Sequence, residues 1–172
     1  MKYNAQVKNK YAEVFAVESM DDYSPNKKDV LDFTEVLSDS AVRKYITDEA
    51  LSKYKINSVN NLASGILENS AEKWKLREEL RFLIRYSKEK TIVGMIGIDL
   101  KTQISGEMWF YKISSTTSFM YEAINEILSF LKNEDIEEVT TTFEEANTRS
   151  IDLLKRLGFA NSSNVNEMVI FL

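Results

Sequence analysis

The sequence contains neither cysteine nor histidine, and these two absences exclude several kinds of chemistry. Without cysteine there is no disulfide framework and no thiolate metal ligand. Without histidine, the commonest catalytic base and metal ligand is missing as well. We therefore expect no metal site, and any proton transfer falls to carboxylates, tyrosines, water or a group on the substrate itself.

Proline and glycine are scarce too: there is one proline, Pro25, and there are five glycines. No stretch rich in Ser, Gly or Pro is long enough to act as an interdomain linker, and no internal repeat is visible. The 172 residues, 44% of them hydrophobic, provide enough apolar material for one sizeable core. Residues 1–172 are thus predicted to form a single domain.

Long apolar runs and basic patches are also missing. No run reaches the roughly 20 residues of a membrane-spanning helix, and the first residues lack the hydrophobic centre of a secretory signal. The 27 acidic and 22 basic residues are interspersed and give a net charge of −5, which disfavours nucleic acid as a partner. We expect a cytoplasmic protein with neither a membrane nor a nucleic-acid partner. Its mild acidity suits a cationic amine, but it also suits ordinary solubility.

The spacing of the apolar residues predicts a mixed α+β fold. The predicted strands, which alternate or are rich in β-branched residues, are 11–17, 81–86, 92–100, 107–113, 139–143 and 167–172. The predicted helices, which repeat apolar residues at helical spacing, are 26–37, 42–46, 58–67, 118–131 and 147–157. The order is one strand, a helical excursion, three antiparallel strands, then helix, strand, helix and strand.

Four segments in this order carry a resemblance to a known family. They are LSDSAVRKYI at 37–46, IVGMIGIDL at 92–100, GEMWFY at 106–111 and NTRSIDLLKRLGF at 147–159. Together they resemble the GNAT superfamily of acyl-CoA-dependent N-acetyltransferases, in particular its ribosomal-protein N-terminal acetyltransferase-like branch. The resemblance implies a GNAT-like central sheet, mixed but mostly antiparallel, with about six to seven strands flanked by helices.

The resemblance also implies acetyl-CoA as co-substrate and an amine as acceptor. In the family, amides of a glycine-rich turn at the start of the long helix bind the cofactor's pyrophosphate, where free N–H groups and the helix dipole attract an anion. That turn corresponds here to Ser115, Thr116, Thr117 and Ser118. No glycine occurs between Gly106 and Gly158, and the basic residue of the family's turn is absent.

The Ser/Thr turn allows two interpretations. Its hydroxyl groups can donate to phosphate, which would make it a variant cofactor site. They can equally cap the helix and occupy the amides that a phosphate would use, while their side chains crowd the approach that glycine permits. The sequence leaves both open.

Further site residues follow from the resemblance. Main-chain groups near Tyr111, Lys112 and Ile113 are expected to pair with the pantetheine arm where two strands splay apart. Asn147 is expected to contact the cofactor arm, and Ser150 to steer the leaving thiol. Alternatively, Asn147 or Thr148 simply caps the helix that follows, a role for which Asn is among the best residues, and both roles can coexist.

A carboxylate is the natural catalytic base in a chain without histidine. Glu107 is the first candidate because it opens the central strand at the family's acidic position, and Glu144, just beyond the fifth strand, is the second. Each can instead be a solvated charge at the end of a strand, and a water relay would leave no trace in the sequence.

Three alternatives follow from this interpretation. The first is transfer of an acetyl group by direct attack to a primary amine of a protein N-terminus, a polyamine or a small amino compound. The second is a degenerate GNAT-fold protein that binds a ligand or partner without catalysis. The third is a different α+β fold that lacks the splayed strand pair. A homodimer is compatible with all three.

Overall fold

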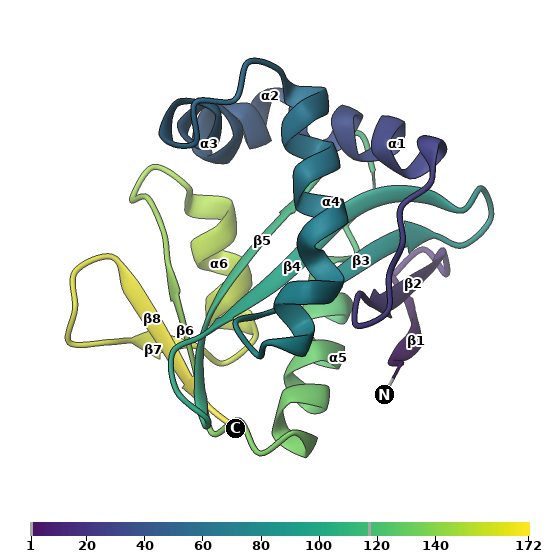
Figure 1. Ribbon diagram of the computed structural model, residues 1–172. Helices are drawn as coiled ribbons and strands as arrows, with labels where there is room; N and C mark the ends of the chain where they lie inside the picture. The colour runs from purple at the N-terminus through teal and green to yellow at the C-terminus, as the bar shows by residue number, and fades with distance from the viewer. Residues whose placement is uncertain (1, 117) are drawn as a thin grey trace.

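The centre of the molecule is a mixed sheet. Within residues 2–116 and 118–172, which the computed structural model describes, eight strands lie in the order β1-β2-β3-β4-β5-β6-β8-β7 (Figure 1). Their bounds are Asn4–Lys8 (β1), Val14–Ser19 (β2), Glu79–Tyr86 (β3), Thr91–Leu100 (β4), Ser105–Lys112 (β5), Glu138–Thr142 (β6), Ala160–Asn161 (β7) and Glu167–Phe171 (β8). Neighbouring strands are antiparallel except β5 and β6, which are parallel. The predicted α+β fold with a mostly antiparallel sheet is confirmed.

Helices follow β2 and alternate with the later strands. Their bounds are Lys27–Ser38 (α1), Ser40–Val42 (α2), the π-helical segment Arg43–Thr47 (η1), Asp48–Lys53 (α3), Val59–Lys75 (α4), Met120–Asn133 (α5) and Thr148–Arg156 (α6). The predicted cap at Ser58 is confirmed, since its side chain accepts a hydrogen bond from Asn61 N. In the described part of the chain, no helix combines the length and the apolar character needed to cross a membrane.

The helices cover both faces of the sheet. α1 and α4 lie on one face, and α5 and α6 lie on the other (Figure 1). On the first face, Phe33 of α1 and Leu67 of α4 are buried with Leu83 and Met95 of the strands. On the second face, α5 buries the apolar stripe that its period predicts, namely Met120, Ala123, Ile124, Ile127, Leu128 and Leu131.

The described residues form eight strands, whereas the sequence predicted about six to seven. The apolar pattern missed β1, where only Val7 is buried, and the two-residue β7. The strand predicted at 11–17 begins three residues later, as β2. The reason is a turn in which the Asn9 side chain accepts hydrogen bonds from the amides of Tyr11, at 3.0 Å, and Glu13, at 3.1 Å.

A buried carboxylate ties α1 to the sheet. Asp29, which is 3% exposed, accepts hydrogen bonds from Arg85 at 2.8 Å and from the Tyr23 hydroxyl at 2.7 Å, and Arg85 also pairs with Glu18 at 2.9 Å. Burial alone would raise the pKa of Asp29, but the hydrogen bonds from Arg85 and Tyr23 hold it below its ordinary value. Asp29 also closes a capping box with Asn26 at the start of α1.

Candidate active site

The strands β5 and β6 pair over a short stretch and then separate. Their pairing covers only Ser105, Gly106 and Glu107, opposite residues 138–140. Beyond this point β5 stays paired with β4 as far as Lys112, while β6 stays paired with β8. Within residues 2–116 and 118–172, the later half of β5 therefore has no strand on its β6 side, and the predicted splayed pair is present. The alternative of an unrelated α+β fold is wrong.

The register of β5 determines which main-chain groups face the opening. Lys101 N donates to Ser105 O at 3.0 Å and Ile113 N donates to Val93 O at 2.9 Å, so the odd-numbered residues of β5 bond to β4. In an antiparallel pair the alternate residues point the other way. The N–H and carbonyl groups of Phe110 and Lys112 thus face the splay.

This geometry refines the predicted set of cofactor-binding residues. The main-chain groups of Lys112 face the splay, and its contact with the cofactor stays a prediction. Phe110 is a further candidate that the sequence reasoning missed, because the alternation depends on the register of the β4–β5 hairpin. The amide of Ile113 is already bonded to β4, and its carbonyl accepts from Thr116. The contacts expected for Tyr111 and Ile113 stay predictions.

The turn after β5 is held by hydrogen bonds to Asp39 and by a hydrogen bond within the turn. Ser114 donates to the carboxylate of Asp39 through its amide, at 2.9 Å, and through its hydroxyl, at 2.5 Å. The Thr116 hydroxyl donates to Ile113 O at 2.9 Å. Ser115 and Ser118 are exposed, whereas Thr117 lies outside the described residues. The hydroxyl groups of Ser114 and Thr116 are thus used within the turn and by Asp39.

The helix α5 begins at Met120, two residues later than predicted. Its N-cap is Phe119, which makes no capping hydrogen bond with its side chain and is instead buried and stacked on Phe15 at 4.4 Å between ring centroids. Among the described residues, no Ser or Thr hydroxyl caps the amides of the first turn. A helix start of this kind keeps N–H groups for an anion.

Asp39 joins the N-terminal helices to this turn. One oxygen of its carboxylate accepts from Ala41 N at 3.0 Å and so caps α2, while the other accepts from Ser114, 75 residues further along the chain. Burial would raise the pKa of Asp39, but hydrogen bonds from Ser114 and from backbone amides of α2 hold it below its ordinary value. The segment that supported the family resemblance at 37–46 thus has a structural role.

The two candidate bases differ in their surroundings. Glu107 is the last residue of β5 that pairs with β6, and its carboxylate accepts from Thr142 Oγ1 at 3.2 Å and pairs with Lys101 Nζ at 2.9 Å. Glu144 is exposed in the connection from β6 to α6. A hydrogen bond with Tyr45 and then the charge of Glu144 raise the pKa of Lys44 in η1.

The start of α6 confirms one predicted role. Asn147 is the N-cap, and its side chain accepts from Ser150 N at 3.4 Å. Ser150 is half-buried in the first turn of α6. The contact of Asn147 with a cofactor and the role of Ser150 toward a thiol are not tested by this geometry and stay predictions.

Two stacked aromatic side chains lie on the face of β5 that packs against α1 and α4. The indole of Trp109 stacks on the ring of Tyr111, with centroids 5.3 Å apart, and its Nε1 donates to Asp99 at 3.3 Å. The indole lies so close to Gly97 that a Cβ atom there would be 2.1 Å from Trp109 Cζ2. Burial raises the pKa of Tyr111. Trp109 is partly exposed and lies on the same face of β5 as Glu107, the face on which α1 and α4 pack.

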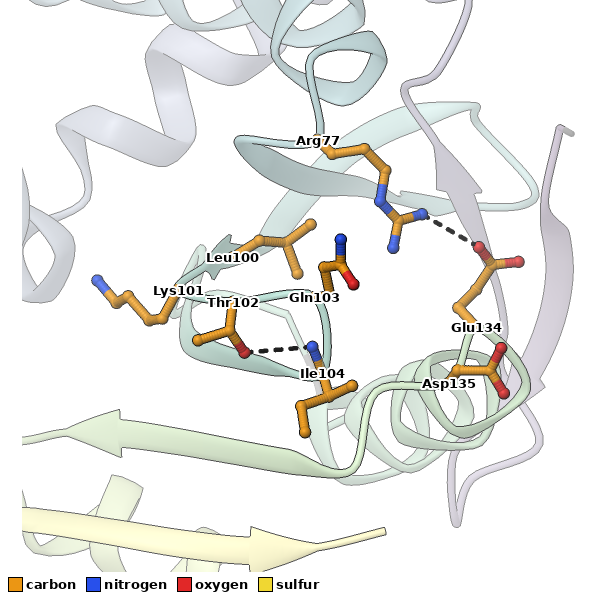
Figure 2. A pocket seen from close by; sticks show the side chains of 8 residues that line it. All are labelled: Arg77, Leu100, Lys101, Thr102, Gln103, Ile104, Glu134 and Asp135. Atoms are coloured by element: carbon orange, nitrogen blue, oxygen red, sulfur yellow. Dashed lines mark hydrogen bonds and ion pairs between the residues drawn. The ribbon is translucent and has the colours of Figure 1, made fainter.

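Two hollows are present in the described surface. A small one of about 190 Å³ touches the turn through Ser115 and Thr116. The larger, of about 670 Å³, lies at the opposite end of β5, between the β4–β5 connection and the end of α5, and Arg77 and Glu134 pair across it at 3.4 Å (Figure 2). It contains none of the predicted site residues, so the site is defined by the splay. No group of three or more acidic side chains in residues 2–116 and 118–172 is placed to hold a metal ion.

Comparison with known families gives the class of this protein. The family profile described as an acetyltransferase (GNAT) domain matches residues 24–160, which is most of the chain. The chain therefore belongs to the GNAT acetyltransferase family, and the resemblance found in its sequence motifs is confirmed. No curated protein matches it by sequence.

Solved structures with this fold include enzymes of the expected branch. RimJ from Mycobacterium smegmatis, in complex with CoA-disulfide, superposes with a TM-score of 0.69 at 13% identity over 98% of this chain and 86% of that one. The ribosomal-protein-S5-alanine acetyltransferase from Vibrio fischeri superposes with a TM-score of 0.65 at 11% identity, over 97% of this chain and 94% of that one. A SpeG spermidine N-acetyltransferase chimera from Vibrio cholerae and hSSAT superposes with a TM-score of 0.67 at 12% identity, over 91% of this chain and 95% of that one. The chain spans 47% of the length of a further match, a cAMP-binding acyltransferase from M. smegmatis. At these identities the likeness shows the fold.

Proposed function

We propose that this protein transfers an acetyl group from acetyl-CoA to a primary amine. The observation that carries the proposal is the splay between β5 and β6, which leads from outward-facing main-chain groups of Phe110 and Lys112 to the start of α5, where the N-cap Phe119 makes no capping hydrogen bond with its side chain. A pantetheine arm can pair with the exposed strand edge as an added strand would. Its diphosphate then reaches a helix N-terminus, where free amides favour an anion.

The residues around the splay can perform direct transfer. The amine nitrogen attacks the thioester carbonyl carbon, a C–N bond forms, and an outward-facing N–H of β5 stabilises the oxyanion. Glu107, directly or through a water molecule, takes the proton that the amine loses, and Glu144 is the second candidate. When the C–S bond breaks, the thiolate leaves toward Ser150 and takes up a proton from solvent, while Glu107 returns the proton it accepted to solvent. The products are an amide and free coenzyme A.

The acceptor side favours a cationic amine. Trp109 provides an aromatic face, Asp99 accepts a hydrogen bond from its indole, and Glu107 lies on the same face of β5. Solved proteins of this fold include a ribosomal-protein-S5-alanine acetyltransferase and a spermidine N-acetyltransferase chimera. We therefore propose a protein N-terminus or a polyamine as acceptor, with the reaction in the cytoplasm.

Acetyl-CoA binding and turnover test the proposal together. Acetyl-CoA at about 100 times its Kd should add about 2.7 kcal/mol to the free energy of unfolding. A release assay for free thiol, run with spermidine and with peptides that begin with serine or alanine, then identifies the acceptor. The double variant Thr116→Gly with Ser118→Gly should bind acetyl-CoA more tightly, since glycine lets the phosphate approach the amides more closely. Unchanged affinity would count against placing the diphosphate at this turn.

The second candidate is a degenerate GNAT-fold protein that binds a ligand or partner without catalysis. The absence of glycine from residues 115–118 favours it. No thermal shift at millimolar acetyl-CoA and no thiol release would support this candidate over the enzyme.

A further inference from the structure

The side chain of Lys112 lies inside the turn between β5 and α5. Its Nζ donates to the carbonyl oxygens of Thr116, at 3.0 Å, and Ile113, at 3.2 Å. The same carbonyl of Ile113 accepts from the Thr116 hydroxyl at 2.9 Å. One ammonium group therefore holds both ends of the 113–116 segment.

Strand geometry explains why this lysine reaches the turn. Lys112 is the last residue of β5, and the alternation of the strand sends its side chain to the face covered by α5. Its Nζ lies 5.9 Å from the ring centroid of Phe119, the N-cap residue of α5. The ammonium group is thus placed between the turn and the beginning of the helix.

The peptide group that joins Ile113 to Ser114 is held from both ends. Its carbonyl oxygen accepts from the ammonium of Lys112, and its N–H donates to the carboxylate of Asp39 at 2.9 Å. Charge-assisted hydrogen bonds of this kind are stronger than neutral ones. They fix the path of the turn without any glycine.

Lys112 also brings positive charge to a turn that has none of its own. Residues 115–118 contain no basic side chain. Burial lowers the pKa of Lys112, and the charge of Arg149 in the first turn of α6 lowers it further, while Asp39 acts in the opposite direction. Lys112 therefore places one positive charge at the carbonyl oxygens of Ile113 and Thr116.

We propose that Lys112 is a positioning residue for a diphosphate-bearing cofactor. From the end of β5 it holds the 113–116 segment in place and supplies the positive charge that residues 115–118 lack. The inference rests on the proposed function, because it takes that cofactor to be acetyl-CoA. Lys112 acts through the turn that it shapes and through its charge, and it takes no part in the bond-making steps.

Binding of coenzyme A and of pantetheine, which lacks the phosphates, tests this inference. Both Kd values are measured by calorimetry for the wild type and for Lys112→Met, Lys112→Gln and Lys112→Arg. Lys132→Met is the matched control, because Lys132 is an exposed lysine in the last turn of α5, at the opposite end of that helix from the turn. We expect Lys112→Met to weaken coenzyme A binding about 10- to 100-fold and to leave pantetheine binding within about twofold. Lys112→Arg should restore most of the loss.

Each outcome decides the question. Equal losses for coenzyme A and pantetheine, or wild-type binding of both, would overturn the role of Lys112. If Lys112→Met does not fold, Lys112→Gln replaces it, since glutamine keeps a donor for the two carbonyls but carries no charge. A wild type that binds neither compound overturns the proposed function together with this inference. A wild type that binds coenzyme A while the variants match it overturns this inference alone.

Discussion

Replacement of Gly97 by alanine is expected to destabilise the protein and to displace the indole of Trp109. A Cβ atom at Gly97 would lie 2.1 Å from Cζ2 and 2.2 Å from Cε2 of the indole. Carbon atoms attract one another at about 3.5–4.0 Å and repel strongly at such short distances. Because the indole is also stacked on Tyr111, it must give up that contact in order to move.

The size of the effect follows from two opposing contributions. Forcing an extra methyl group into a packed site costs about 1–3 kcal/mol. Removal of a strand glycine offsets about 0.5–1 kcal/mol of this, since alanine has less freedom in the unfolded chain. We expect a net loss of about 1–2 kcal/mol in the free energy of unfolding, which for a chain of this length corresponds to a fall in Tm of about 2–8 °C.

Calorimetry measures the shift, and a second glycine provides the control. A Cβ atom at Gly65, in the exposed part of α4, would meet nothing within 4 Å. Gly65→Ala makes the same chemical change and should stabilise the protein by about 0.5–1 kcal/mol. The two alanine variants should therefore move Tm in opposite directions.

The indole itself can be tested with Trp109→Leu, which removes the ring that meets the new methyl group. The cost of Gly97→Ala should largely disappear in this background, because the two residues are in direct contact and their effects are not additive. The reasoning is refuted if Gly97→Ala costs the same with and without the indole, or if it stabilises the protein as Gly65→Ala does.

Three further predictions concern charge, capping and catalysis. Asp29→Asn should cost about 3 kcal/mol at pH 7, because it leaves Arg85 without one buried carboxylate partner. The pKa of Asp29 is lower in the folded protein than in the unfolded chain, where it is about 4. The stabilisation by its charge is therefore present above about pH 4 and is lost as the pH falls from there through the folded-state pKa. Urea unfolding at pH 7 and at pH 3 measures the difference in free energy of unfolding between wild type and Asp29→Asn. Asn147→Ala should cost about 1 kcal/mol in urea unfolding, and Asn147→Asp should retain the cap. Glu107→Gln should lower kcat about 100-fold and Glu144→Gln much less, as measured by thiol release.

Each of these has an outcome that contradicts it. A gap between wild type and Asp29→Asn that is equal at both pH values would show that ionisation of Asp29 contributes nothing. An Asn147→Asp variant as unstable as Asn147→Ala would argue against the cap. If Glu144→Gln abolishes turnover and Glu107→Gln does not, then Glu144 is the base.

Local patterns were sufficient to predict most of the elements. The stripe of α5 and the caps at Ser58 and Asn147 depend on residues a few positions apart, so period and capping chemistry identify them from the sequence. β1 escaped prediction because an edge strand with one buried residue, Val7, has almost no apolar alternation. The start of α5 was misplaced because Phe119, rather than a hydroxyl residue, occupies the N-cap.

The candidate site depends on contacts that no local pattern contains. The pairing of Asp39 with Ser114 joins residues 75 positions apart. The exposure of the Phe110 main chain follows from the register between β4 and β5, and the reach of Lys112 into the turn follows from which face its side chain takes. The family motifs predicted a candidate site beside β5, and the tertiary structure was needed to show which main-chain atoms face the splay.

The double attachment of Asp39 has a consequence for protein engineering. The helices α1 to α3 form a continuous piece that could be exchanged between relatives, but one carboxylate in that piece anchors a turn encoded far downstream. A transplant that lacks an acidic residue at position 39 would leave the Ser114 amide without its acceptor. Chimeras should therefore exchange the helices and the 113–116 segment as one unit.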